Sequence, residues 1–419
     1  MANNLYVNDA HTLMNAIAKQ VLGADAPQAI DTTSFVTVAE TTLRAGVETT
    51  LSAISQVLGE TIFSNRPYSG KFKILTVSEM RWGNQVRKLS PLYSETEKPE
   101  DYNTYDNAAI LYDGASIDMY KINNPKTIQT NFYGSQALQK HITRYRDQLY
   151  AAFRNEAEFM RFIDMVMTEF NNEIEVINES KARATVLNYI TGVNLMASTY
   201  DTTENAGRVV DLVAAYNEEF NTSYTRAQLL TTYISDFMKF IAAEIKIYSS
   251  RLTDFGYLYH SNIGSGDSKK WIPRHTPKSR QKMLMYNPIF VRAESEVYSG
   301  LFNPQYLEIG DFEGVNFWQS PQNPTKIVCK PNYMNATTGA SASASEAVTM
   351  DYVLGVLFDE EALGIRPGFD YSSTTPFNSA GGYYNMFMHW RWQNYVDYTE
   401  NGIVFVLGEG GEAEQNGEG

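Results

Sequence analysis

Phe159-Met-Arg-Phe-Ile-Asp-Met-Val-Met-Thr-Glu-Phe-Asn-Asn-Glu-Ile-Glu-Val-Ile177 is the stretch of sequence that decides the fold. Its apolar residues recur every third or fourth position and form one stripe, made of Phe159, Phe162, Ile163, Val166, Met167, Phe170, Ile174 and Ile177. Charged residues lie off that stripe, at Arg154, Glu158, Arg161, Asp164 and Glu169. The spacing predicts the strongest helix of the chain within residues 145–190, with its end set by Gly192. A helix of about 30 residues spans about 45 Å, so it would form a rigid strut across a domain.

Helices are also predicted on both sides of this strut. One is expected from Thr33 to Phe63, where apolar residues again recur at helical spacing: Val47, Leu51, Ile54, Val57 and Leu58. Residues 1–30, which contain Gly23 and Pro27, suit an extended arm. Two more helices are expected around Val209–Phe220 and Thr225–Tyr248. Thr225 with Gln228 forms an approximate capping box for the second of these.

Residues 71–130 change from a helical to a strand-like pattern. Lys71–Val77 and Ala109–Tyr112 are typical of strands, and a polar section from Arg81 to Asn107 lies between them. This section carries a basic block and then an acidic block, made of Arg81, Arg87 and Lys88, then Glu95, Glu97, Glu100, Asp101 and Asp106. A polar section between two strands predicts a long hairpin that projects from the body. The alternative is a solvated, disordered insertion.

The C-terminal part is rich in Tyr, Trp, Val and Phe. Three strand-like runs, Tyr352–Phe358, Tyr383–Trp392 and Ile403–Leu407, predict a packed sheet. Before them, the small residues of Asn335–Ser345 predict a mobile linker. After them, Glu409–Gly419 consists mostly of Gly and Glu and predicts a disordered acidic tail.

Composition limits the classes of protein to which the chain can belong. Its 419 residues are enough for two or three packed sub-domains. Charged residues make up 20%, below the roughly 25% of typical soluble domains, while Tyr and Phe are plentiful. This bias suits a subunit that buries much of its surface against neighbours, although a β-rich domain would share it. The net charge of −14 argues against a chain that grips DNA as a whole, because DNA binding depends on cations.

No pattern predicts a catalytic, cofactor-binding or metal site, and no cofactor is expected. None of the five histidines is spaced i, i+4 from another, and His389, between Met388 and Trp390, is typical of a packed side chain. Gly264–Lys270 lacks the spacing of a phosphate-binding loop. Cys329 is the only cysteine, so an internal disulfide is impossible, and no neighbouring base would activate its thiol. The sequence therefore predicts a protein that is not an enzyme, with a cytoplasmic enzyme of unrecognised family as an alternative.

The order of the predicted elements resembles that of tailed-bacteriophage major capsid proteins, whose fold is shared with the herpesvirus shell floor and with encapsulins. Local stretches resemble short-tailed-phage members: Met80–Gly83, Leu284–Phe290 with Tyr298 and Phe302–Pro304, Leu363–Pro367, Thr375–Asn378 with Tyr384, and Thr399–Val404. The resemblance covers about residues 35–408. It implies an α+β fold in six segments. These are an N-terminal arm and first helix (1–60), an E-loop hairpin with flanking strands (61–130), a P-domain with a spine helix (131–195), an A-domain (196–346), closing P-domain strands (347–408) and a disordered acidic tail (409–419).

The resemblance implies a structural function, in which hexamers and pentamers of the chain assemble into an icosahedral shell around phage double-stranded DNA. The residues expected to contact other subunits are those of the hairpin: Arg81, Arg87, Lys88, Glu95, Glu97 and Glu100. A shell of an encapsulin-like compartment is the alternative within the same fold.

The resemblance also implies partners and a place of assembly. Because the core is expected to begin near residue 33, the sequence predicts a separate scaffolding protein and not a built-in scaffolding segment. A portal and decoration or auxiliary capsid proteins are further expected partners, whereas sequence-specific DNA binding and a membrane are not. Residues 1–20 show no signal peptide, and no apolar run approaches the length of a membrane span. The expected location is the virion, after assembly in the host bacterial cytoplasm.

Overall fold

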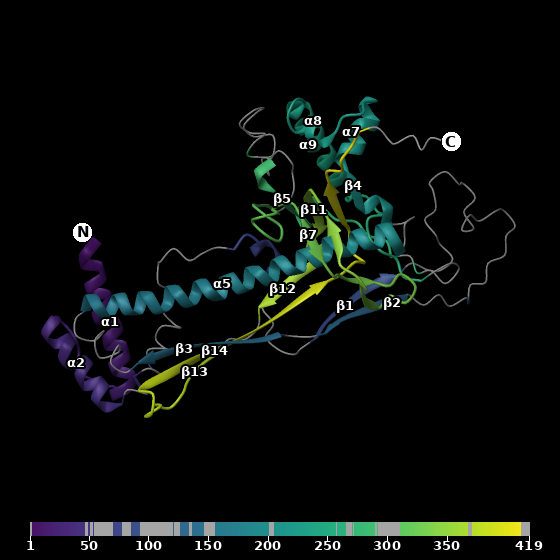
Figure 1. The fold of residues 1–419 in the computed structure, drawn as a ribbon. Coiled ribbons are helices and arrows are strands. Elements are labelled where there is room, and N and C mark those ends of the chain that lie inside the picture. Colours follow the sequence, from purple (N-terminus) through teal and green to yellow (C-terminus); the bar gives the residue numbers. More distant parts are fainter. Residues whose placement is uncertain are drawn as a thin grey trace.

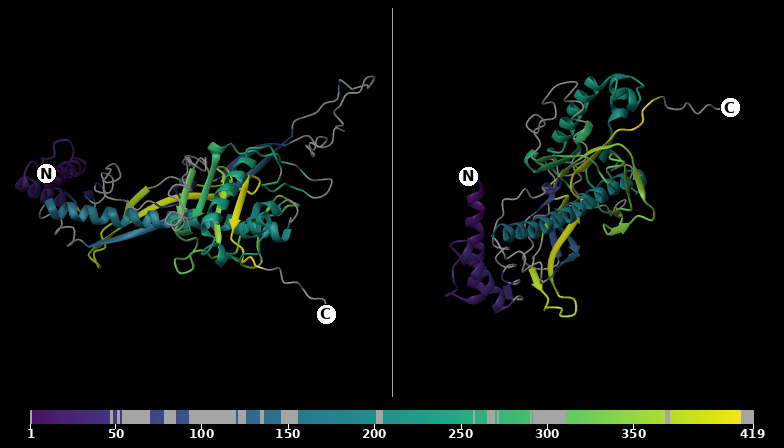
Figure 2. Two further views of the ribbon diagram at one scale, coloured as in Figure 1. Left: turned by 90° about the horizontal axis from the view of Figure 1, so that it is seen from above. Right: turned by 60° about the vertical axis from the view of Figure 1, so that its left-hand side comes forward.

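The protein is described by a computed structural model, in which helices and sheets are mixed along the chain (Figure 1). The structure describes residues 2–46, 49–50, 53, 70–77, 85–92, 120, 126–133, 136–145, 156–200, 205–256, 258–264, 270, 272–289, 291, 311–367 and 371–411. This architecture confirms the predicted α+β class. One long helix crosses the molecule, with two N-terminal helices near its first end and a sheet with further helices near its last end (Figures 1 and 2).

The predicted strut is helix α5, Glu156–Leu195. Its 40 residues span about 60 Å at about 1.5 Å per residue. The predicted end was wrong, because the helix passes through Gly192 and continues into the π-helical turn η2, Met196–Tyr200. Gly192 has a packing role, since a Cβ atom there would overlap the hydroxyl of Tyr398. The side chains of the stripe before residue 172 lie outside the described ones.

The last turns of α5 cover one face of a five-stranded sheet. Its strands, in spatial order, are β4 (Val209–Asp211), β15 (Gly402–Val406), β11 (Val353–Asp359), β5 (Gln281–Tyr286) and β6 (Asp311–Val315). The two edge strands run parallel to their neighbours, and β11 runs antiparallel to both of its own. Ile403 and Phe405 point to one core, and Val404 between them points to the other, which contains α5. The sheet is therefore covered on both faces.

The second face of this sheet is covered by helices α7 (Leu212–Phe220), α8 (Arg226–Leu229) and α9 (Ile234–Arg251). The predicted capping box is confirmed. Thr225 Oγ1 accepts from the backbone N–H of Gln228 at 3.3 Å, and Gln228 Oε1 accepts from the Thr225 N–H at 2.9 Å. The helix that this box begins is only four residues long, so the single helix predicted after Thr225 is in fact two.

The three closing runs belong to two sheets and not to one. β11 and β15 pair with each other in the sheet described above. β14, Tyr383–Val396, pairs instead with β3 (Gln136–Tyr145), β12 (Leu363–Pro367) and β13 (Tyr371–Thr374). Residue composition predicted the strands correctly, but it carries no information about which strand pairs with which.

The N-terminal residues are helical, which corrects the predicted extended arm. Helix α1, Ala2–Leu22, packs on α2, Thr32–Ala45, through a separate small core that includes Leu13, Met14, Ile17, Phe35, Val38 and Leu43. The core of the protein therefore does not begin near residue 33. Gly46 follows the end of α2, and Val47, Leu51, Ile54, Val57 and Leu58 of the predicted longer helix lie outside the described residues.

Strands β1 (Gln85–Leu92) and β2 (Lys126–Tyr133) form an antiparallel pair, so a hairpin is present where one was predicted. Its boundaries differ from the prediction. Lys71–Val77 is not a strand but contains the short 3₁₀ helix η1, Lys73–Leu75, whose Leu75 is buried, and Thr76 then bridges to Ile365. The predicted strand Ala109–Tyr112 lies outside the described residues.

The expected mobile linker, Asn335–Ser345, is instead largely a turn between two short strands. β8 (Asn332–Met334) pairs with β9 (Ser341–Ser343), and the Asn335 side chain accepts from the backbone N–H groups of Thr337 and Thr338. Nearby, β7 (Ile327–Cys329) pairs with β10 (Val348–Met350). Short 3₁₀ helices complete the described elements: η3 (Ala206–Arg208) and η5 (Lys278–Arg280).

The acidic tail begins later than predicted. The carbonyl of Glu409 accepts from the backbone N–H of Arg226 at 2.8 Å, and Gly410 forms a bridge with Thr225. Residues 409–411 are therefore attached to the body. Residues 412–419 lie outside the described ones.

Candidate assembly surface

The two strands of the hairpin present one face to the body of the subunit and one face outward. Side chains alternate along a strand, and Lys88 and Ser90 on the inward face of β1 are half-buried and buried. Arg87 and Leu89 on the other face are exposed, and Leu89 keeps 63% of its accessible surface. On β2, Tyr133 is 72% exposed. The outward face therefore combines a cation with uncovered apolar surface.

Lys88 attaches β1 to the turn that joins β14 to β15. Its Nζ lies 2.9 Å from Asp397 Oδ2, is bonded to Glu400 Oε1, and lies 3.3 Å from Glu361 Oε2. The side chains of Asp397 and Glu400 are only 3% and 8% exposed. We call the set Lys88, Glu361, Asp397, Glu400 and Arg274 the hairpin root. It is a largely buried ion-pair cluster within one chain.

Burial and neighbouring charges act in opposite directions on this cluster. Burial lowers the pKa of Lys88, but the carboxylates of Asp397 and Glu400 outweigh it and raise the pKa to about 12. Lys88 is therefore charged at neutral pH. For Glu400, burial outweighs the attraction of Lys88 and Arg274, so its pKa lies above the usual value. The cluster thus holds one firmly charged cation beside a carboxylate that is less stable in its charged form.

Two arginines bind the acids of the root: Arg274, which belongs to it, and Arg280, which pairs with Glu361 from outside it. Arg274 Nε lies 2.8 Å from Glu400 Oε1, and Arg274 Nη2 donates to Ser90 Oγ of β1 at 3.1 Å. Arg280 Nε lies 2.6 Å from Glu360 Oε1, and its Nη2 pairs with Glu361. Burial raises the pKa of Glu361, but its bonds to Arg280 and the charge of Lys88 outweigh this and lower it overall.

The second strand is attached as well. Gln393 Nε2 donates to the carbonyl of Phe132 on β2 at 3.0 Å. The rings of Phe132 and Tyr395 lie 5.3 Å apart. Both strands of the hairpin are therefore fixed to β14 or to the turn after it, so the direction in which the hairpin leaves the body is determined.

The turn itself is built from its own short side chains. Asp397 Oδ1 accepts from the Thr399 backbone N–H at 2.9 Å and from the Thr399 hydroxyl at 2.6 Å. Asn401 Oδ1 lies 3.0 Å from Nδ1 of the buried His260. Burial, followed by the charge of Arg274, lowers the pKa of His260 to about 3, so this imidazole is neutral at pH 7. The Thr399 contacts hold the carboxylate of Asp397 toward Lys88.

The predicted contact residues have different outcomes. Lys88 is engaged within its own chain, and its expected contact with another subunit stays a prediction. Arg87, its neighbour on the opposite face, is exposed. Arg81, Glu95, Glu97 and Glu100 lie outside the described residues.

The sequence does not reveal the partners of Lys88, which are Glu361, Asp397 and Glu400, or the cation Arg274, which pairs with Glu400. Asp397–Asn401 resembles an ordinary polar loop between two strands, and only its position between two buried strands hints at burial. Arg274 follows a Gly/Ser/Lys-rich loop, and no local pattern marks it.

The described part of the chain offers no group of three or more His, Cys, Asp or Glu side chains arranged to hold a metal. None of the helices described there has the length and apolarity that crossing a bilayer requires.

Comparison with known proteins identifies the architecture. The family model of the Phi29-like phage major capsid protein matches residues 14–406. A chain from the capsid structure of Staphylococcus phage Andhra superposes with a TM-score of 0.52 at 10% identity, covering 83% of this chain and 87% of that one. A chain from a structure of native bacteriophage P68 gives a TM-score of 0.49 at 10% identity, covering 83% and 86%. A search of curated proteins found no match.

The matched family is that of a structural protein. The family match begins inside α1 and spans the other described helices, the two larger sheets and the hairpin root. The chain therefore belongs to the Phi29-like phage major capsid protein family and is a subunit that self-assembles into the capsid shell of the virion.

Proposed function

We propose that the hairpin begun by β1 and β2 is the arm with which one subunit holds the next in the shell. The single observation that carries this is the contrast between the two faces of β1. Lys88 on the inward face is fixed by carboxylates of its own chain, while Leu89 on the outward face is 63% exposed. A two-stranded hairpin is only marginally stable alone, so apolar surface on its free face is best explained by a partner.

The root gives such an arm a defined direction. A contact repeated head to tail between identical subunits closes a ring if the rotation fits. The same contact at two slightly different rotations would produce the pentamers and hexamers of an icosahedral shell. The basic and acidic blocks, including Arg81, Arg87, Glu95, Glu97 and Glu100, would then set the register between subunits more than the affinity.

The other expected partners follow from the resemblance alone. We propose a separate scaffolding protein, a portal and decoration or auxiliary capsid proteins as partners, with assembly in the host cytoplasm before the shell encloses double-stranded DNA. The net charge of −14 supports DNA that is enclosed and not gripped by the shell as a whole, because an acidic chain does not neutralise phosphates.

The test is to replace residues 93–125 with a short Gly-containing turn, so that β1, β2 and Lys88 are kept. The shortened protein should fold, because the described cores lie elsewhere, but it should form no closed shells. Circular dichroism and thermal melting report the fold, and electron microscopy of protein co-expressed with its scaffold reports shells.

Deletion of residues 412–419 is the matched control, because it removes a segment beyond the last backbone contact of the tail at Gly410. This variant should assemble as the full chain does. Normal shells from the shortened hairpin would contradict the proposed function.

A further inference from the structure

The segment Asp397–Gly411 joins parts of the molecule that are far apart in the chain. It begins with the turn whose acids hold Lys88 of the hairpin. Tyr398 of the same turn packs against Gly192 of α5, where its ring and hydroxyl fill the space that a Cβ atom would need. The turn therefore fixes the hairpin and the spine helix to the same few residues.

A buried arginine attaches this turn to the start of the helical layer. Arg208 is fully buried, and its Nε donates to the carbonyl of Gly402 at 3.2 Å. Its Nη1 donates to Asn205 Oδ1 at 3.1 Å and to Ser261 Oγ at 2.9 Å, and its Nη2 donates to the hydroxyl of Tyr189 on α5 at 3.3 Å. One side chain thus connects the spine, the start of β15 and the chain on both sides of the helices α7 to α9.

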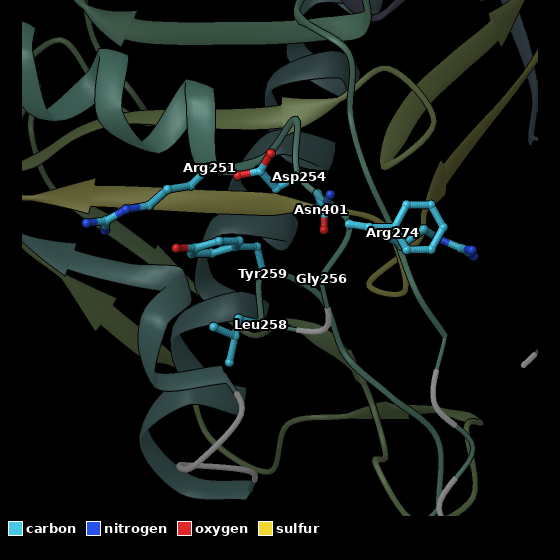
Figure 3. A pocket seen from close by; sticks show the side chains of 8 residues that line it. Arg251, Asp254, Gly256, Leu258, Tyr259, Arg274 and Asn401 are labelled. Atoms are coloured by element: carbon cyan, nitrogen blue, oxygen red, sulfur yellow. The ribbon is translucent and has the colours of Figure 1, made fainter. Parts of the chain in front are cut away.

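The end of the turn also closes against the chain that follows α9. Figure 3 shows Asn401 lying between Tyr259 and Arg274, in the wall of a surface pocket. The backbone N–H of Gly402 donates to the carbonyl of Tyr259 at 2.9 Å. The turn is therefore held from this side as well.

Beyond β15, the chain ties down the starts of two helices. We call Leu407–Gly411 the strap. The N–H of Gly408 donates at 2.8 Å to Asp211 Oδ1, the same oxygen that caps α7. Arg226, the first residue of α8, donates from Nη1 to the carbonyl of Leu407 at 2.9 Å. The strap therefore holds α7 and α8 against the end of β15.

The strap also holds a strained residue in place. Tyr352, just before β11, has a φ of 53°, a conformation that a bulky side chain seldom adopts. Its carbonyl accepts from the N–H of Leu407 at 3.0 Å, and its ring lies 3.5 Å from the guanidinium of Arg226. Strain of this kind persists only where the surrounding structure enforces it. Closing the strap therefore fixes the start of β11 too.

Every partner of this segment precedes it in chain order. A growing chain folds from its N-terminal side, so the core of α1 and α2 and the helix α5 can form early. In the described sheet, however, β4 is paired with β15 alone. Lys88 likewise meets Asp397 and Glu400 only after the turn has been made. Spine, hairpin and helical layer therefore stay unfixed relative to one another until Asp397–Gly411 joins them.

We propose that Asp397–Gly411 is a completion lock, which makes a subunit competent to enter a shell only when its chain has been made through the strap. Copies in a symmetric assembly must present the same surfaces to one another. A copy whose parts are not fixed would therefore introduce a defect, and the lock excludes chains that end before Gly411. The proposal concerns folding within one subunit and holds whichever surfaces the subunits use to meet.

The timing of folding during synthesis tests the lock on the full chain. A translational arrest sequence is placed after residue 419 through flexible linkers of increasing length, and folding is detected because it pulls on the ribosome and releases the arrest. The last folding signal should appear only when the linker brings Gly411 out of the exit tunnel. Folding that is complete while the strap is still inside the tunnel would overturn the inference.

Entry into shells tests the consequence. In Gly410→Ala, a Cβ atom would lie 2.5 Å from the carbonyl oxygen of Tyr224 and 2.6 Å from Val213 Cγ1, so the strap must open. Gly411→Ala is the matched control, because its backbone is also left-handed but its Cβ would meet nothing closer than 3.5 Å. Each tagged variant is co-expressed with the untagged native chain and the scaffold. The share of tagged chains in shells, relative to the soluble pool, should fall about tenfold for Gly410→Ala and stay near that of the native chain for Gly411→Ala.

Hydrogen exchange of the unassembled subunit shows whether the strap has opened. For Gly410→Ala we expect faster exchange in α7 and α8 and unchanged exchange in α1 and α2. If the subunit unfolds throughout, Arg226→Lys takes its place, because a lysine lacks the planar fork that stacks on Tyr352 while donating to Leu407. An opened strap with a native share of shells would show that the lock does not control assembly. Unchanged exchange in both variants would show that the strap does not hold the helices, and either result overturns the inference.

Discussion

The spine helix and the hairpin are attached to the same turn by different physics. Tyr398 of that turn packs into the notch at Gly192 of α5, and its ring stacks on Tyr189 at 5.5 Å with an angle of 7° between planes. Asp397 and Glu400, on either side of Tyr398 along the turn, hold Lys88 of the hairpin by charge. One short segment therefore fixes a rigid strut by shape and an assembly arm by ion pairs.

The two attachments should respond differently to solution conditions. The packing of Tyr398 against Gly192 allows only one arrangement, because protein interiors are close-packed and do not deform continuously. An ion-pair cluster of several carboxylates and cations responds to pH, to salt and to any charge that a neighbouring subunit brings. The comparison therefore predicts that the spine contact is insensitive to solution conditions and that the hairpin root is the adjustable one.

The largest expected effect is on the spine contact. Gly192→Ala would place a Cβ atom on the Tyr398 hydroxyl and ring, so α5 and the turn must separate. Overpacking of this kind should lower the free energy of unfolding by about 3 kcal/mol. Urea unfolding of the unassembled subunit measures it. Gly207→Ala is the control, because its Cβ would meet nothing closer than 3.9 Å. Equal stability of the two variants would show that the notch is not needed.

A smaller loss is expected when the root is broken. Lys88→Met removes the cation, but Arg274 still pairs with Glu400 and Arg280 with Glu361, so Asp397 alone loses its charged partner. We expect a loss of about 2 kcal/mol, below the usual cost of an unpaired buried charge. Arg87→Met, on the exposed face of the same strand, should change stability by less than about 0.5 kcal/mol. Hydrogen exchange should be faster in β1 and β2 of the Lys88 variant only, and faster exchange throughout the protein would contradict a local role.

The pH dependence of stability tests the contact between the buried His260 and Asn401 of the turn. Its folded pKa of about 3 lies below the ordinary value of 6.5, so the folded state binds fewer protons than the unfolded state between these values. The stability contributed by the neutral imidazole is therefore complete above pH 6.5 and is lost as the pH falls. From pH 7 to pH 5.5 the loss should be about 1 kcal/mol.

The His260→Gln variant separates this effect from that of Glu400, whose raised pKa acts in the opposite direction. The slope of stability against pH should be shallower in the variant than in the native protein. Identical slopes would mean that the pKa of His260 does not change on folding.

Much of this fold was predictable because it depends on local patterns. The apolar stripe located α5, and Thr225 with Gln228 located a helix start. The pairing of strands was not predictable, since strand composition does not show that β14 and β15 enter different sheets. The function of Gly192 was also hidden, because a glycine that ends a helix and a glycine that admits a distant tyrosine look the same in a sequence.

The partners of Lys88 in the hairpin root were also not predictable from the sequence. Lys88 lies in a basic block and was expected at the surface, but its partners are 309 and 312 residues away in the chain. A charged residue in a strand is buried only if distant acids meet it, and one sequence does not show that they do. The sequence predicted a hairpin in this part of the chain, but it predicted neither the bounds of its strands nor the charges that hold it.

Salt gives the smallest effect and the most direct comparison of the two attachments. Raising NaCl from about 0.1 M to about 1 M shortens the screening length from about 10 Å to about 3 Å. Lys88 is 17% exposed, so screening should reach the root only in part. The stability difference between native protein and Lys88→Met should therefore narrow by about 0.5 kcal/mol. The stability difference between native protein and Gly192→Ala should stay constant, because steric overlap carries no charge.

Urea must be the denaturant in this measurement, since guanidinium is itself a salt. If both differences narrow equally, the two attachments do not differ in kind. If neither stability difference narrows, the root is held by its hydrogen bonds and packing more than by its charges.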